Sequence, residues 1–177
     1  MNKLSFLLKP LLIVLVFILA LWLIAFLNQP SLPSLPSFSL SPGKGQFKTG
    51  QEFKVDLVLN AKAEINAADT VLSFDPNLIE VAAIQPGQVF PLYPRQSIDP
   101  QKGEVQITGV KTIQDNRVLT TPKIFATLIL KAKKPGTAKL NFIFNKGKTT
   151  GSTIIKSQGS ENILEKVEGG KYEIKSY

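Results

Sequence analysis

Cysteine and histidine are both absent from this chain of 177 residues. Without cysteine there is no disulfide bond, no thiolate metal ligand and no lipid on an N-terminal cysteine. Without histidine there is no imidazole for a metal site or for the base of a catalytic triad. Two carboxylates could still serve glycoside hydrolysis, but thirteen acidic residues bring some pair close in any fold. We therefore predict no catalytic site, no cofactor and no bound metal.

Tryptophan is nearly absent too, and its single copy, Trp22, lies within one long apolar run. The run, Leu11–Leu27, has seventeen residues, and the indole nitrogen is its only polar side-chain atom. A helix needs roughly 20 apolar residues to cross a bilayer. Phe6–Leu8 adds apolar length beyond Lys9 and Pro10. The run therefore predicts one transmembrane helix, through which the protein contacts the membrane.

The charges that flank this run predict its orientation. Lys3 and Lys9 precede it, and the next charged residue is Lys44. The positive-inside rule then leaves residues 1–10 in the cytoplasm and the C-terminal part outside the cell, in a single-pass protein of the cell membrane. A cleaved secretory signal is the alternative, but it requires a small-x-small cleavage site, which residues 23–30 lack.

A proline-rich segment without charge separates the run from the rest of the chain. It covers residues 28–37 and contains Pro30, Pro33 and Pro36. Such a composition favours an extended polyproline II conformation over a helix. We interpret the segment as a linker, and residues 38–177 as a single domain that is long enough to bury a core.

The domain shows apolar residues at every second position, with turn signals between short segments. This pattern is typical of an all-β sandwich. Residues 89–99 are interpreted as a loop, because Pro91 and Pro94 exclude a central strand. Residues 112–121 are interpreted as a polar connection. After a first strand that begins at Phe38, we expect strands at 53–59, 69–74, 78–84, 105–109, 124–131, 138–144, 152–156 and 171–177. These make about nine strands, arranged in two antiparallel sheets that pack face to face.

Four segments follow one another along the domain: 47–57, from Phe-Lys-Thr-Gly into a strand; 65–81, with Phe-Asp-Pro-Asn at its centre; 105–109; and 124–138, which ends in Lys-Pro-Gly-Thr-Ala. In this order they resemble the cohesin domains of cellulosome-like assemblies. The resemblance covers roughly residues 38–175. It implies a nine-stranded antiparallel sandwich with jelly-roll topology, related to some carbohydrate-binding modules. It also implies a non-catalytic domain that receives a helical dockerin on the flat face of one sheet.

The resemblance also implies candidate partner-binding residues. Asp69 stands six residues before Asp75, where the family places an aspartate on the dockerin-facing sheet. Strand alternation places two further residues on the same outward face as Asp69, and two more are candidates from another strand. The candidates are Asp69, Val71, Ser73, Gln106 and Thr108. The resemblance further implies that calcium is carried by the dockerin partner.

The turn Asp75-Pro76-Asn77 also suits calcium through its oxygen atoms, but turn chemistry explains the same residues without a metal. The lysines are scattered along the sequence from Lys44 to Lys175, which favours a solvated surface and argues against nucleic acid as a partner.

The predicted function is a monomeric, membrane-anchored extracellular module that docks a dockerin-bearing or similar secreted protein at the cell surface, with a link to polysaccharide breakdown. The alternatives are a carbohydrate-binding module, with polysaccharide as its ligand, and a cell-surface adhesin. Sugar-binding faces rely on exposed rings, whereas the tyrosines outside the apolar run, Tyr93, Tyr172 and Tyr177, are far apart. The sequence therefore favours protein recognition.

Overall fold

The structure is a computed structural model that describes residues 15, 18–20, 22, 35–112 and 121–176. It divides into two units, residues 1–33 and 34–177. The described residues of the first unit are helical and exposed. Within the described ranges, no helix is long and apolar enough to cross a membrane. The predicted transmembrane run lies mostly outside the described residues, as does most of the predicted polar connection at 112–121.

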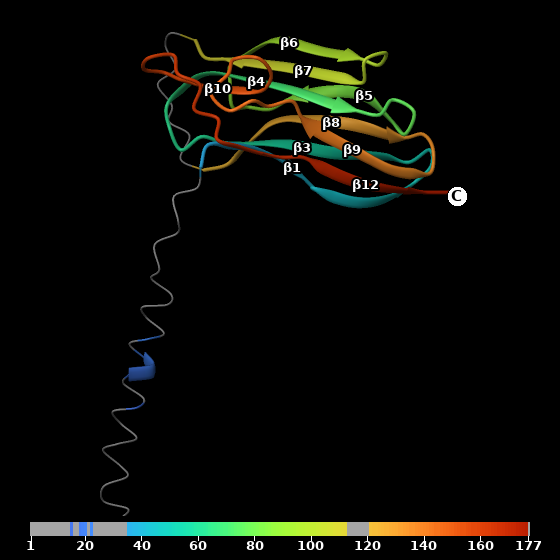
Figure 1. The fold of residues 1–177 in the computed structure, drawn as a ribbon, viewed down its shortest axis with the longest axis horizontal. Helices are drawn as coiled ribbons and strands as arrows, with labels where there is room; N and C mark the ends of the chain where they lie inside the picture. Colours follow the sequence, from blue (N-terminus) through green and yellow to red (C-terminus); the bar gives the residue numbers. More distant parts are fainter. Residues whose placement is uncertain (1–14, 16–17, 21, 23–34, 113–120, 177) are drawn as a thin grey trace, which may run out of the picture. The chain divides into compact units, whose positions relative to one another are not determined.

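The second unit is a sandwich of two β-sheets, which confirms the predicted all-β class (Figure 1). The five-stranded sheet has the order β11 (Lys166–Glu168), β1 (Ser37–Ser41), β3 (Glu52–Asn60), β8 (Lys123–Ala132) and β5 (Ile79–Pro86). The seven-stranded sheet has the order β2 (Lys44–Lys48), β12 (Gly170–Lys175), β9 (Gly136–Phe142), β4 (Ile65–Phe74), β7 (Glu104–Val110) and β6 (Leu92–Asp99). Its seventh strand, β10 (Thr153–Lys156), pairs with β4.

Twelve strands replace the expected number of about nine, because β2, β6 and β11 were not predicted. The expectation of a loop at 89–99 is wrong for β6, which pairs with β7 and forms one edge of its sheet. Proline is tolerated on an edge strand, where a missing N–H breaks no ladder. The register of β6 also shifts between Leu92 and Arg95, on either side of Pro94. β11 has only three residues, too few for an alternating pattern.

The expectation of purely antiparallel sheets is wrong at two places. β11 runs parallel to β1, and β12 runs parallel to β2. In both cases the chain passes from the five-stranded to the seven-stranded sheet at a glycine corner, Gly43 or Gly169. The corners contact each other, since the Lys171 N–H donates to the Gly43 carbonyl at 3.0 Å. A Cβ on Gly169 would lie 2.7 Å from the Leu140 carbonyl oxygen, so this corner requires glycine.

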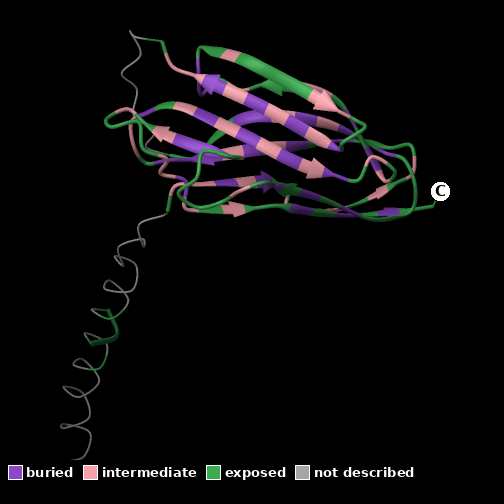
Figure 2. Ribbon diagram, turned by 45° about the horizontal axis from the view of Figure 1, so that its top comes forward, coloured by how far each residue is buried: buried purple, intermediate pink, exposed green. Residues whose placement is uncertain are grey.

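The core lies between the two sheets and follows the alternation predicted from the sequence. Figure 2 shows buried and less buried residues alternating along the strands. Leu57 on β3 and Leu72 on β4 are both fully buried, one in each sheet. Tyr172 is fully buried as well, and its hydroxyl donates to the Pro42 carbonyl at 2.9 Å. The buried core residues that the structure describes all fall within 38–174 and belong to the second unit.

Candidate functional site

All five candidate residues lie side by side on the outer face of the seven-stranded sheet. β4 and β7 pair antiparallel, which places Asp69 opposite Thr108 and Val71 opposite Gln106. Ser73 is the next outward residue of β4. Each of the five is half-buried, and they alternate with fully buried neighbours. The structure therefore brings the whole predicted set onto one surface.

The Asp69 carboxylate is fixed by two hydroxyl groups from neighbouring strands. Thr108 Oγ1 donates to Asp69 Oδ1 at 2.6 Å, and Thr153 Oγ1 donates to Asp69 Oδ2 at 3.1 Å. Each carboxylate oxygen can accept a further hydrogen bond, since the two hydroxyl donors use about half of the acceptor sites. Asp69 is therefore an oriented acceptor that can receive a charged or polar donor from a partner.

The edge strand β6 adds Arg95, a residue that the sequence analysis missed because it fell in the expected loop. Arg95 stands opposite Thr108 in the register, and its Nη1 donates to Gln106 Oε1 at 2.8 Å. Gln106 Nε2 in turn donates to Glu104 Oε1 at 2.5 Å. The Gln106 amide is thus held on both sides, in a row of polar groups that runs across β6 and β7.

The segment between β9 and β10 borders the candidate site, which the sequence did not predict. The Ser152 hydroxyl accepts from the Val71 N–H at 3.0 Å and donates to the Val71 carbonyl at 3.3 Å. Ile143 donates its N–H to the same carbonyl at 2.7 Å, and its side chain is 38% exposed. Gly151 has a φ of +100°, and a Cβ there would lie 2.6 Å from the Ile143 carbonyl oxygen. These contacts hold the segment against β4.

A shallow hollow of about 440 Å³ lies over these strands. It is lined by Asp69, Thr70, Val71, Arg95, Glu104, Gln106, Ile107, Thr108, Ile143, Thr149 and Gly151. The hollow combines fixed polar groups with apolar residues, of which Val71 and Ile143 are partly exposed and Ile107 is buried. This mixture is typical of a protein-binding surface, in which a few apolar anchors sit among polar contacts.

The turn at Asp75 has the expected turn chemistry. Asp75 Oδ1 accepts from the Asn77 N–H at 2.9 Å and from Asn77 Nδ2 at 3.1 Å. The Asp75 carbonyl accepts from the N–H groups of Leu78 and Ile79, each at 3.1 Å. These hydrogen bonds confirm the predicted turn. Among the residues that the structure describes, no three acidic side chains gather into a group that could hold a metal ion.

Two comparisons identify relatives of the chain. The model of the cohesin domain family matches residues 38–170. Among solved structures, the chain is similar to the third cohesin of ScaC from Acetivibrio cellulolyticus, in complex with the ScaB dockerin, at 17% identity and a TM-score of 0.64. That match covers 79% of this chain and 99% of the other.

Two further solved structures share the fold. The OlpC cohesin–dockerin complex of Clostridium thermocellum matches at 17% identity and a TM-score of 0.65, over 85% of this chain and 99% of the other. A non-cellulosomal cohesin of the archaeon Archaeoglobus fulgidus matches at 12% identity and a TM-score of 0.60, over 81% and 93%. No curated protein sequence matches. Because the family model spans most of the sandwich, the chain belongs to the cohesin domain family.

Proposed function

We propose that the outer face of the seven-stranded sheet around Asp69 docks a dockerin-bearing or similar secreted protein. Cohesin modules are non-catalytic protein-binding domains, so the chain is not an enzyme. Two of the solved relatives are complexes with dockerins. In this proposal the calcium belongs to the dockerin, and a link to polysaccharide breakdown would come from the docked partner.

One observation carries the proposal: the Asp69 carboxylate is held by Thr108 and Thr153 on a half-buried surface that also contains apolar side chains. A carboxylate fixed before binding loses little conformational freedom when a partner donor reaches it. Val71 and Ile143 supply apolar area beside it. A few such anchors carry most of the energy of a protein interface.

A polysaccharide ligand has less support from this surface. Flat sugar sites rely on aromatic rings that stack against the sugar. The outward positions of β4 are Asp69, Val71 and Ser73, and none of the described residues that line the hollow is aromatic. We therefore favour protein recognition over the carbohydrate-binding alternative.

We also propose that Leu11–Leu27 anchors the domain in the cell membrane, with the sandwich outside the cell. The length of this apolar run and the two lysines before it support this orientation. Fractionation of cells tests the anchor: the full chain should stay with the membranes after alkaline extraction, and a variant without residues 1–33 should not. Recovery of the full chain in the soluble fraction would instead indicate a cleaved signal and a released adaptor.

The binding proposal is tested by calorimetry of the full chain, in a nonionic detergent, against dockerins from the same genome, with and without calcium. The informative variant is Asp69→Asn, because an amide can keep the contacts to both threonine hydroxyls while it removes the charge. Loss of a charged hydrogen bond across an interface should weaken binding roughly 10- to 100-fold.

Asp56→Asn is the matched control for this experiment. Asp56 accepts a hydrogen bond from Thr127 at 2.6 Å, but it lies on β3 in the other sheet. Its variant should bind within about twofold of the parent, since surface changes away from an interface are near neutral. Equal losses for the two variants would place the binding surface elsewhere, and no binding by any dockerin would contradict the proposal.

A further inference from the structure

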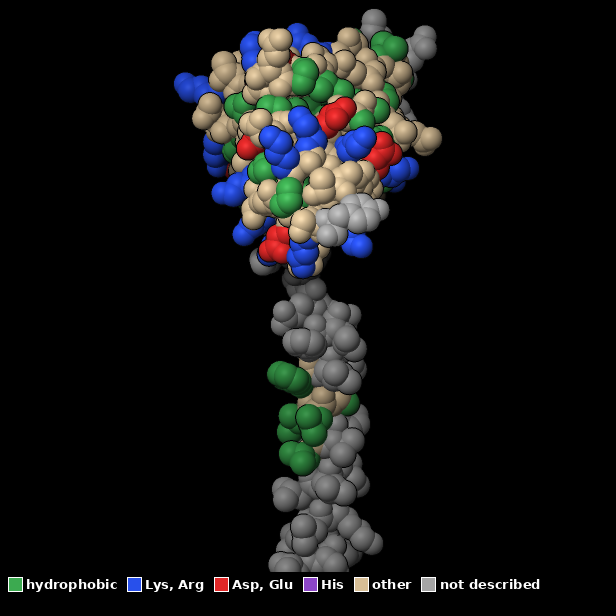
Figure 3. Space-filling view, turned by 90° about the vertical axis from the view of Figure 1, so that its right-hand side faces the viewer, with side chains coloured by type: hydrophobic (Ala, Val, Ile, Leu, Met, Phe, Trp, Pro, Cys, Tyr) green, Lys and Arg blue, Asp and Glu red, His purple; other side chains and the backbone are tan. Residues whose placement is uncertain are grey.

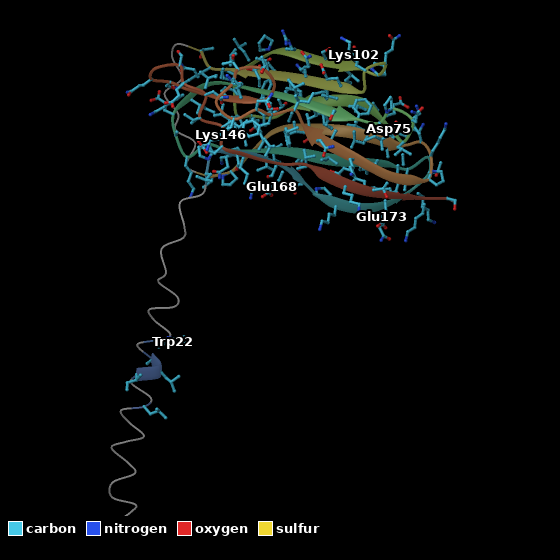
Figure 4. All side chains as sticks on the ribbon, viewed as in Figure 1. Trp22, Asp75, Lys102, Lys146, Glu168 and Glu173 are labelled. Carbon is cyan, nitrogen blue, oxygen red and sulfur yellow. The ribbon has the colours of Figure 1, made fainter. Side chains whose placement is uncertain are left out.

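Five lysines that are scattered in the sequence gather on one half of the seven-stranded sheet. They occupy outward positions on the three adjacent strands β2, β12 and β9, and are Lys44, Lys48, Lys139, Lys171 and Lys175. A single acidic residue, Glu173, lies among them on these strands. Figure 4 labels Glu173 on this side of the domain and Lys102, beside β6 and β7, on the opposite side. We call this group of five lysines the lysine face.

Three of the lysines form a continuous row across the strands. In the strand registers Lys44 is opposite Lys171, and Lys171 is opposite Lys139. Neighbouring strands are about 4.8 Å apart, so the row carries three positive charges over roughly 10 Å of backbone. Like charges directly opposite each other destabilise a sheet. Within the described part of the chain, no ion pair joins any of the three to an acidic group.

The one acidic residue on these strands is already engaged by a neighbour. Gln46 Nε2 donates to Glu173 Oε2 at 3.1 Å, and Lys175 Nζ donates to Gln46 Oε1 at 2.9 Å. These contacts link Glu173 to Lys175 through Gln46. The row of Lys44, Lys171 and Lys139 therefore remains available for an anion from outside the domain.

A hollow of about 400 Å³ lies between β2 and β12 at one end of this row, lined by Lys44, Gly45, Gln46, Lys171 and Glu173. A Cβ on Gly45 would lie 2.7 Å from the Phe47 ring, so a side chain at this position of β2 would force the ring to move. Figure 3 shows the end of the domain that lies at the right in Figure 1, where lysine and arginine side chains outnumber acidic ones. The hollow contains Lys44 and Lys171. A linear anionic polymer can enter such a hollow, whereas a flat anionic surface, such as a membrane, cannot.

We propose that the lysine face binds a linear phosphate-bearing polymer, with the polymer running across β2, β12 and β9. Lysine binds phosphate as a point charge and needs no fixed geometry. None of the exposed residues on these three strands is aromatic or arginine, which removes base stacking and bidentate recognition as modes of binding. The surface is distinct from the half of the sheet that carries Asp69.

The test uses the full chain in nonionic detergent, titrated with long-chain inorganic polyphosphate at several salt concentrations. The variant is the triple change Lys44→Gln, Lys139→Gln and Lys171→Gln. A matched triple, Lys54→Gln, Lys134→Gln and Lys156→Gln, removes the same charge from exposed positions on other parts of the domain. Loss of three phosphate contacts should weaken binding on the order of 100-fold and lower the slope of log affinity against log salt by about 2.

The control triple should change the affinity by less than about tenfold, because its lysines act only through the overall charge. Equal losses for the two triples, or no binding of polyphosphate by the parent, would overturn the proposal. A parallel titration adds phosphatidylglycerol to the detergent micelles. If the first triple lost affinity for those micelles and kept its affinity for polyphosphate, the lysine face would be a lipid-binding surface and the polymer proposal would be wrong.

Discussion

The outer faces of the two sheets carry the same cross-strand pair, an aspartate beside a threonine. On the seven-stranded sheet Thr108 donates to Asp69, and on the five-stranded sheet Thr127 donates to Asp56, each at 2.6 Å. In both pairs the two residues are direct partners in an antiparallel register. The shared geometry shows that such a pair is an ordinary way to satisfy a half-buried carboxylate, and by itself it does not mark a binding site.

The surroundings of the two pairs differ. Asp69 receives a second hydroxyl from Thr153, which comes from β10, a strand 84 positions further along the chain. It also lies in a hollow with Arg95 and Ile143. Asp56 has only one hydroxyl donor among the described contacts, with Ser41 of β1 opposite it on its other side. The neighbours that surround the pair therefore distinguish the two faces.

Buried residues of the two sheets should contribute about equally to the stability of the core. Large-to-small substitutions test this. Leu72 and Leu57 are both fully buried. Leu72 lies on β4, the strand of Asp69, and Leu57 lies on β3, the strand of Asp56. Leu72→Ala and Leu57→Ala should each lower the free energy of unfolding by about 2–5 kcal/mol, by lost burial and a residual cavity. Urea denaturation measures both. A loss below about 1 kcal/mol for either one would show that its sheet is not part of the common core.

The Ser152 hydroxyl bridges the segment between β9 and β10 to Val71 on β4, the strand of Asp69. Removal of this bridge should have the next largest effect on the free energy of unfolding. Ser152 is fully buried and its hydroxyl pairs with both the N–H and the carbonyl of Val71. Ser152→Ala would leave the Val71 N–H without a partner, at a cost of about 1–3 kcal/mol in unfolding free energy. Ser97→Ala, at an exposed position of β6, is the control and should stay within about 0.5 kcal/mol. Similar values for the two would mean that the segment 143–152 is not held by this bridge.

Much of the fold was predictable because alternation reports burial directly. The inward set of β4, Thr70, Leu72 and Phe74, is buried as the sequence predicted. The nearly continuous apolar run of β8 also lies between two neighbours, as predicted for a central strand. Alternation fails at the edges, where one side of the strand has no partner to bury it. β6 is exposed along most of its length, and its pattern resembles that of a loop.

The candidate face was predictable only in part, for a related reason. The outward residues of β4 and β7 follow from alternation within each strand, but their lateral neighbours depend on strand order. Arg95 and Thr153 reach the site through β6 and β10, whose pairing has no local sequence signal. The lysine face was missed in the same way, because its members lie as far apart as Lys44 and Lys175 in the sequence.

The smallest expected effect is the difference in unfolding free energy between the alanine variants of Asp69 and Asp56. Asp69→Ala removes the acceptor of the Thr108 and Thr153 hydroxyls, and Thr153 is only 2% exposed, so water does not readily replace the lost contact. Asp56→Ala removes the acceptor of one hydroxyl, that of Thr127. The extra hydrogen bond should make the loss of unfolding free energy about 1 kcal/mol larger for the Asp69 variant.

Urea denaturation of the two alanine variants, together with both asparagine variants, measures this difference. The asparagine variants should each stay within about 0.5 kcal/mol of the parent, since the amide can keep the hydroxyl contacts. If the alanine variants lose equal stability, the contact from Thr153 contributes nothing, and Asp69 is held no more firmly than Asp56. In that case a difference in partner binding between the two faces would have to come from Arg95 and the apolar side chains around Asp69, and the role of a fixed carboxylate would be withdrawn.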